Sequence, residues 1–142
     1  MIDLSVVVPV YNGETFITRT IGELIDYLAS LDEAAELIVV DDGSTDHTAK
    51  LIDEVVADAP VSVHFEKSPR NEGKGAAITR GMAVARGRYR VFLDADLAYA
   101  PQAIGEIRTC LEKDFPWDGE GIPTLVVYFA KEDGKIVPAL VG

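Results

Sequence analysis

Two acidic residues, Asp94 and Asp96, follow directly on the apolar run 89–93. Carboxylate oxygens are ligands that Mg²⁺ prefers, and the ion is commonly held by one or two carboxylates together with substrate phosphates. The pair therefore predicts a site in which one carboxylate reaches a divalent metal and the other a ribose hydroxyl or a metal-bound water. A plain turn is the alternative interpretation, because Asp is common where strands end.

A second acidic pair, Asp41 and Asp42, ends another apolar run at residues 37–40. The carboxyl ends of parallel strands meet at one edge of a sheet, so both pairs are expected at the same edge. A carboxylate there can accept a hydrogen bond from the ring N–H of a pyrimidine. The pair can equally serve to place negative charge at the positive end of the helix that follows. The sequence leaves these two interpretations open.

A polar loop at residues 67–75 opens a helix rich in small residues. Free backbone N–H groups at the start of a helix suit a phosphate, and Lys74 adds a positive charge beside them. The full spacing of a phosphate-binding P-loop is absent. An ordinary surface loop is the alternative.

The elements that position these groups follow from hydrophobic periodicity. Short apolar runs typical of buried strands alternate with helical patterns. The predicted strands are 4–10, 36–40, 61–65 and 89–93, and the predicted helices are 14–31, a segment capped by Ser44 or Asp46, 76–85 with Gly87 as its C-cap, and one from Pro101. This order predicts a three-layer α/β/α sandwich with a mainly parallel sheet. Residues 124–130 and 135–141 then predict a C-terminal β-hairpin.

Composition narrows the possible partners. The chain has 142 residues, which suits one compact unit, and a formal net charge of −11, which argues against nucleic acid. Its one cysteine, Cys110, cannot form an intrachain disulfide, which fits a reducing cytoplasm. No apolar stretch approaches the length of a membrane span, and no signal peptide is visible at the start.

Four motifs, taken in order, resemble those of family 2 glycosyltransferases with the GT-A fold. They occupy residues 8–12, 39–46, 71–75 and 94–96. Residues 73–77, 85–89 and 94–97 are most similar to the branch of the family that acts on polyprenyl (dolichyl) phosphates. The resemblance covers about residues 4–105, and it implies a Rossmann-like nucleotide-binding fold.

The resemblance also implies an activity and a set of site residues. The activity is transfer of a sugar, with inversion, from a nucleotide-diphosphate sugar such as a UDP-sugar to an acceptor such as a polyprenyl phosphate or a growing glycan. Asp94 and Asp96 would hold Mg²⁺ or Mn²⁺. The nucleotide would be bound by Pro9, Tyr11, Asn12, Glu14, Asp41, Asp42, Lys74 and Asp94.

A catalytic base is not assigned by these motifs. A hydroxyl acceptor requires a base, whereas a lipid phosphate is already ionised and does not. Asp118, Glu120 and Asp133 are candidates by residue type alone.

Residues 1–113 are interpreted as the nucleotide-sugar-binding domain, and 114–142 as a loop and hairpin in the same compact unit. The expected location is the cytoplasm, at the cytoplasmic face of a membrane, and the hairpin offers an edge through which a homodimer would form. One alternative is a non-catalytic or truncated nucleotide-sugar-binding module that lacks the acceptor half. Another is a phosphatase of the Asp-x-Asp class, which Ala98 disfavours because that class usually has a Thr at this position.

Overall fold

The chain is described by a computed structural model that covers residues 2–93, 95, 104–105 and 108–109, and the backbone of 126–132 and 135–141. Strands and helices alternate as the sequence predicts up to β4, and the helix predicted from Pro101 falls largely outside the described residues. The elements are β1 (Leu4–Val10), α1 (Ile17–Ala29), β2 (Ala35–Asp41), α2 (Thr48–Val56), β3 (Ser62–Lys67), α3 (Lys74–Val84), β4 (Tyr89–Phe92), β5 (Val126–Glu132) and β6 (Lys135–Val141).

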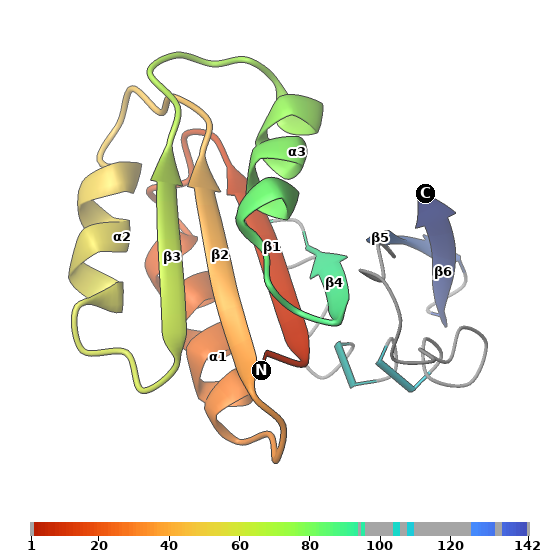
Figure 1. Cartoon of the computed structure of the whole chain (residues 1–142). Helices are drawn as coiled ribbons and strands as arrows, with labels where there is room; N and C mark the ends of the chain where they lie inside the picture. The colour runs from red at the N-terminus through yellow and green to blue at the C-terminus, as the bar shows by residue number, and fades with distance from the viewer. Residues whose placement is uncertain are drawn as a thin grey trace.

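The strands form one sheet in the order β3-β2-β1-β4-β5-β6 (Figure 1). Strands β1 to β5 pair in parallel, whereas β6 runs antiparallel to β5 and forms the predicted hairpin. Helices α1 and α2 lie on one face of the sheet and α3 lies on the other. The prediction of an α/β/α sandwich with a mainly parallel sheet is confirmed.

The central strands β1 and β2 are buried on both faces. Every residue of β1 is buried, and so is every residue of β2 after the first. Successive side chains point to opposite faces, so Val6 and Val8 enter the core under α1 and α2, while Val7 enters the core under α3. This double burial is why both segments read as nearly continuous apolar runs.

Helix α3 lies unusually close to the sheet. A Cβ added to Gly81 would lie 2.4 Å from Val7 Cγ1. Small residues along α3 therefore allow a close approach, and this brings the first turn of the helix near the ends of β1 and β2. The predicted C-cap at Gly87 is wrong, since the helix ends at Val84 with Ala85 as its C-cap. Gly87 instead packs on Ser5, whose backbone N would lie 2.6 Å from an added Cβ.

A buried polar network ties α3 to the opposite, amino edge of the sheet. The carboxylate of Glu36, which is 2 % exposed, accepts hydrogen bonds from Ser5 Oγ (2.6 Å) and from the backbone N–H of Arg86 (2.7 Å). The Arg86 guanidinium lies 3.2 Å from the second carboxylate oxygen. The network satisfies a carboxylate that would otherwise be costly to bury.

We expect Glu36→Gln to lower the free energy of unfolding by about 1–3 kcal/mol, because one acceptor becomes a donor that faces buried donors. Urea denaturation measures the change. Glu23→Gln is the matched control, because Glu23 makes an exposed ion pair with Arg19 that is worth less than about 1 kcal/mol. Equal stability of the two variants would contradict the structural role of Glu36.

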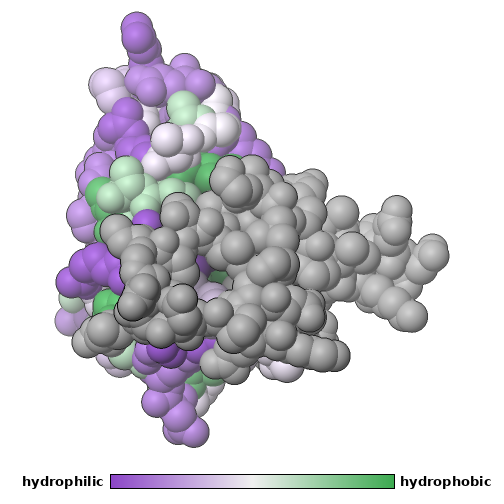
Figure 2. Space-filling model, turned by 45° about the vertical axis from the view of Figure 1, so that its right-hand side comes forward, coloured by the Kyte–Doolittle hydropathy of each residue, from purple (hydrophilic) through white to green (hydrophobic). Residues whose placement is uncertain are grey.

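The described surface is mostly polar. Figure 2 shows hydrophilic residues over the upper and lower parts of this side, with hydrophobic residues gathered across its middle. Among the described residues, none of the helices has both the length and the apolar character required to cross a bilayer.

Candidate nucleotide site

A pocket of about 300 Å³ opens at the carboxyl edge of the sheet, where the sequence predicts a site. Three segments build it: the end of β1, the residue after β2, and the segment that leads into α3. Its lining residues are Pro9, Val10, Tyr11, Asp42, Asn71, Gly73, Lys74 and Ala77. Tyr11 is 45 % exposed, and among the described residues it is the large hydrophobic residue that is exposed to solvent. The pocket thus combines an accessible aromatic ring, a carboxylate and an amine.

Asp42 connects two walls of this pocket. It is 4 % exposed, and its two carboxylate oxygens each accept a backbone N–H, one from Glu72 and one from Gly73, both at 2.9 Å. Its own N–H donates to the carbonyl oxygen of Val10 at 2.8 Å. A carboxylate offers about four acceptor positions, so Asp42 retains capacity for a ligand that carries an N–H.

Gly43 lets the loop before α3 pass directly over the β2–α2 loop. Its φ is +73°, and an added Cβ would lie 2.3 Å from the backbone carbon of Arg70 and 2.5 Å from the nitrogen of Asn71. The N–H of Ser68 donates to the carbonyl of Asp41 at 2.8 Å and continues this contact. Only glycine fits a position that needs both a positive φ and this close approach.

Lys74 is the first residue of α3, and its amine lies near β4. Its Nζ lies 6.0 Å from the centroid of the Phe92 ring, in β4. The amine therefore sits between the pocket and β4, the strand that precedes Asp94 and Asp96 in the sequence. A positive charge at the start of a helix suits an anionic ligand, because the backbone N–H groups there carry partial positive charge.

Asp41 does not line the pocket. It is 3 % exposed, and one of its carboxylate oxygens accepts hydrogen bonds from the hydroxyl and the backbone N–H of Ser44. Of the two acids at the end of β2, Asp42 is the one that faces the pocket.

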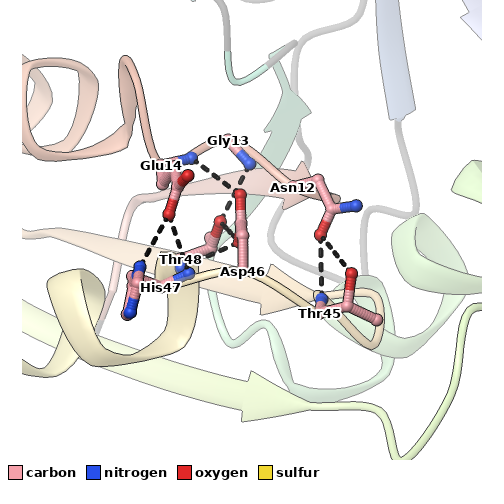
Figure 3. A network of polar contacts seen from close by, with 7 residues as sticks. All are labelled: Asn12, Gly13, Glu14, Thr45, Asp46, His47 and Thr48. Carbon is pink, nitrogen blue, oxygen red and sulfur yellow. Dashed lines mark hydrogen bonds and ion pairs between the residues drawn. The ribbon is translucent and has the colours of Figure 1, made fainter.

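Three consecutive N–H groups of the turn after β1 donate to side chains of the β2–α2 loop and of the first residue of α2. Figure 3 shows the bonds from Gly13 and Glu14. The loop supplies hydroxyl and carboxylate acceptors. The bonds run from Asn12 N to Ser44 Oγ (2.9 Å), from Gly13 N to Thr48 Oγ1 (2.8 Å) and from Glu14 N to Asp46 Oδ2 (3.3 Å).

Hydrogen bonds also run in the opposite direction. Asn12 Oδ1 accepts the N–H of Thr45 at 2.8 Å, and Glu14 Oε2 accepts the N–H of His47 at 3.0 Å and lies 3.0 Å from that ring's Nδ1. We call residues 12–14 and 44–48, joined in this way, the reciprocal clamp. Asn12 and Glu14, predicted as pocket residues, therefore belong to the clamp beside the pocket and not to its lining.

Asp46 is held as an anion within the clamp. Desolvation acts to raise its pKa, but hydrogen bonds from the hydroxyl and N–H of Thr48 and from the N–H of Glu14 place that pKa below its ordinary value. An ionised carboxylate only accepts hydrogen bonds, which matches the donors around it. The predicted helix cap by Ser44 or Asp46 is wrong, since the N-cap of α2 is His47, which makes no side-chain cap hydrogen bond. Asp46 instead accepts the N–H of Thr48, and Ser44 bonds to Asp41.

Asp94 and Asp96 lie outside the described residues, as do Asp118, Glu120 and Asp133. Leu93 and Ala95, on either side of Asp94 in the sequence, are described. The N–H of Leu93 donates to the carbonyl of Val7 at 2.9 Å, and the carbonyl of Ala95 accepts the Thr20 hydroxyl at 2.6 Å. Within the part of the chain that the structure describes, no group of three His, Cys, Asp or Glu side chains is placed to hold a metal ion.

Sequence reasoning missed Gly43 and Thr48. Gly43 lies in the loop after β2, and Thr48 is the first residue of α2. The sequence of this segment drew attention to its acids and its helix cap instead. The available signal was the number of hydroxyl and amide side chains in the two neighbouring loops at one edge of the sheet, which predicts hydrogen bonds between those loops.

A parallel α/β sheet with a polar pocket beyond its carboxyl ends is the architecture of nucleotide-binding domains. The solved structures similar to this chain are glycosyltransferases with the GT-A fold. A mannosyltransferase from Pyrobaculum calidifontis in complex with GDP-Man and Mn²⁺ matches with a TM-score of 0.65 and 26 % identity, over 76 % of this chain and 32 % of that one. S. aureus TarS 1–349 in complex with UDP-GlcNAc matches with a TM-score of 0.63 and 25 % identity, over 87 % of this chain and 37 % of that one.

The chain belongs to glycosyl transferase family 2, whose sequence profile matches residues 5–118. A dolichyl-phosphate β-glucosyltransferase of Dictyostelium discoideum is 38 % identical over 99 residues, which are 66 % of this chain and 30 % of the relative. An undecaprenyl-phosphate 4-deoxy-4-formamido-L-arabinose transferase of Proteus mirabilis is 35 % identical over 112 residues, 79 % of this chain and 34 % of the relative. The chain thus spans about a third of the length of these relatives.

Proposed function

We propose that this chain binds a nucleotide-diphosphate sugar, most simply a UDP-sugar, and takes part in transferring the sugar with inversion to a polyprenyl phosphate. The observation that carries the proposal is the pocket at the carboxyl edge, in which Tyr11, Asp42 and Lys74 come together from three segments of the chain. The names of the relatives and the UDP-GlcNAc complex of a structural neighbour support the donor and the acceptor.

In this proposal each lining residue has a chemical role. Pro9 and Tyr11 give the base an apolar and aromatic surface, and Asp42 accepts the ring N–H that uracil and guanine carry but cytosine lacks. Lys74 offsets the charge of the diphosphate. We assign Asn12, Glu14 and Asp41 to the frame of the site, since their side chains hold its loops together.

We propose Asp94 and Asp96 as the ligands of Mg²⁺ or Mn²⁺, with Asp94 also close to the nucleotide. The donor chemistry fits, because two carboxylates next to a diphosphate suit a hard divalent cation. The metal would offset the negative charge that develops on the departing nucleoside diphosphate. Complexes of two structural neighbours with Mn²⁺ support this assignment.

A lipid-phosphate acceptor would bring the reaction to a membrane face and would need no general base. We propose that residues 1–113 bind the donor, that 114–142 complete the same unit, and that the edge strand β6 offers a surface for pairing with a second copy.

We expect calorimetric titration to show that UDP binds more tightly than GDP or CDP, and that Mn²⁺ tightens the binding. Asp96→Ala should bind UDP but lose the effect of Mn²⁺, because it removes a carboxylate that would hold the metal. Asp58→Ala, which removes an exposed carboxylate away from the pocket, is the control and should behave as the native protein. Equal weak heats for all three nucleotides in both the native protein and Asp96→Ala would refute the proposal.

The described pocket offers groups for a nucleotide, which also fits a second function, a nucleotide-sugar-binding module without transfer activity. A product assay with a UDP-sugar and a polyprenyl phosphate separates the two functions. Donor binding without turnover would favour the module.

A further inference from the structure

We propose that Thr48 is a positioning residue for nucleotide recognition: its hydroxyl fixes the turn after β1 and thereby holds Tyr11 in the pocket that Asp42 also lines. This inference rests on the proposed function, since its readout is nucleotide binding. In this inference the buried hydroxyl of Thr48, which does not line the pocket, helps to set the affinity and the base preference of the pocket.

The turn after β1 depends on the β2–α2 loop for its shape. Asn12 has a φ of +50°, in the left-handed region that most residues with a side chain avoid and that Asn tolerates better than most. The N–H groups of residues 12–14 all donate to Ser44, Thr48 and Asp46, which are 32 to 35 residues further along the chain. The conformation next to Tyr11 is therefore imposed from outside the turn.

Thr48 makes the central bond of the reciprocal clamp. It is 0 % exposed; its hydroxyl accepts the buried N–H of Gly13 at 2.8 Å and donates to Asp46 Oδ1. The carboxylate of Asp46 also accepts a hydrogen bond from the backbone N–H of Thr48 at 2.9 Å. The hydroxyl thus has one accepting and one donating contact, and water has no access to replace either.

Gly13 transmits this contact to the pocket. It lies two residues from Tyr11, and an added Cβ would come within 2.7 Å of Val10 Cγ2, so the turn packs tightly against the end of β1. Tyr11 itself is 45 % exposed, so side-chain packing restrains its ring only in part. Its place in the pocket is consequently set by the backbone that the reciprocal clamp holds.

The test compares Thr48→Val, which keeps the shape and removes the hydroxyl, with Thr48→Ser, which keeps the hydroxyl. We expect the Kd for UDP in the presence of Mn²⁺ to rise about tenfold in Thr48→Val, because the turn next to Tyr11 loses its hydrogen bond to Thr48 and has to be ordered when the nucleotide binds. A tenfold rise in Kd corresponds to about 1.4 kcal/mol. Thr48→Ser should remain within about twofold of the native protein. The preference for UDP over CDP should fall in Thr48→Val and return in Thr48→Ser.

A second variant guards against loss of folding. Asp46→Asn keeps one oxygen for the Thr48 N–H but can direct its amide at the N–H of Glu14, which weakens the bond between the loops and should change the Kd in the same direction. A purely structural role would lower the melting temperature of these variants and leave the Kd and the UDP preference, measured well below melting, unchanged. That result would overturn the inference alone. Absence of UDP binding by the native protein would overturn the proposed function and the inference with it.

Discussion

Asp42→Ala is expected to bind UDP about thirtyfold more weakly than the native protein. The substitution removes the acceptor proposed for the ring N–H of the base. It also leaves the N–H groups of Glu72 and Gly73 without the carboxylate oxygens that each holds at 2.9 Å. Together these losses are on the order of 2 kcal/mol, and about 1.4 kcal/mol corresponds to a tenfold change in Kd. Calorimetric titration with UDP and Mn²⁺ measures the effect.

Two further variants sharpen this result. Asp42→Asn keeps one acceptor oxygen and should fall between the native protein and Asp42→Ala. Asp53→Ala removes an exposed carboxylate that pairs with Lys67 away from the pocket, and its Kd should be unchanged. A native Kd in Asp42→Ala would mean that this carboxylate neither contacts the nucleotide nor holds the pocket wall.

Gly43→Ala is expected to lose about 2–5 kcal/mol of unfolding free energy. A φ of +73° costs about 1–2 kcal/mol for a residue with a Cβ. The added atom would also lie 2.3 Å from the backbone of Arg70, so the loop before α3 has to move. Backbone displaced in a packed region adds a cost similar to overpacking, about 1–3 kcal/mol. Urea denaturation measures the loss.

The control is another glycine-to-alanine change at a position with room. Gly22 lies within α1, and an added Cβ would meet no atom within 4 Å. Gly22→Ala should raise stability by about 0.5–1 kcal/mol, because alanine favours the helix more than glycine does. If Gly43→Ala were as stable as the native protein, this result would contradict the close approach of the β2–α2 loop to the loop before α3.

The fold was predictable because its signals are local. The β1 and β2 segments are buried on both faces, so their sequences are nearly continuously apolar, and the helix α1 between them carries apolar residues at helical spacing. What local patterns do not contain is the depth at which helices sit. The contact of Gly81 with Val7, for example, joins residues far apart in the chain. The local sequence therefore predicted a helix there, but it could not predict how closely that helix lies on the sheet.

The site was predictable in its place but not in its detail. Because β1 and β2 are parallel neighbours, their carboxyl ends lie at one edge of the sheet, and Tyr11 and Asp42 were both expected there. Which of Asp41 and Asp42 faces the pocket depends on how the chain turns after the strand, and this turn is fixed by Ser44 and by the contact of Gly43 with Arg70. The roles of Asn12 and Glu14 depend on partners more than thirty residues away, which spacing does not reveal.

The position of β1 in the sheet has a consequence for biosynthesis. This strand leaves the ribosome before its neighbours, yet it pairs with β2 on one side and with β4 on the other, and the second pairing joins Leu4 to Tyr89. Its seven apolar-rich residues therefore stay without one partner strand until residue 92 has been translated. Contacts of such sequence separation slow folding and leave nascent hydrophobic strands open to aggregation. Shielding by a chaperone is thus most valuable to this chain until β4 has been synthesised.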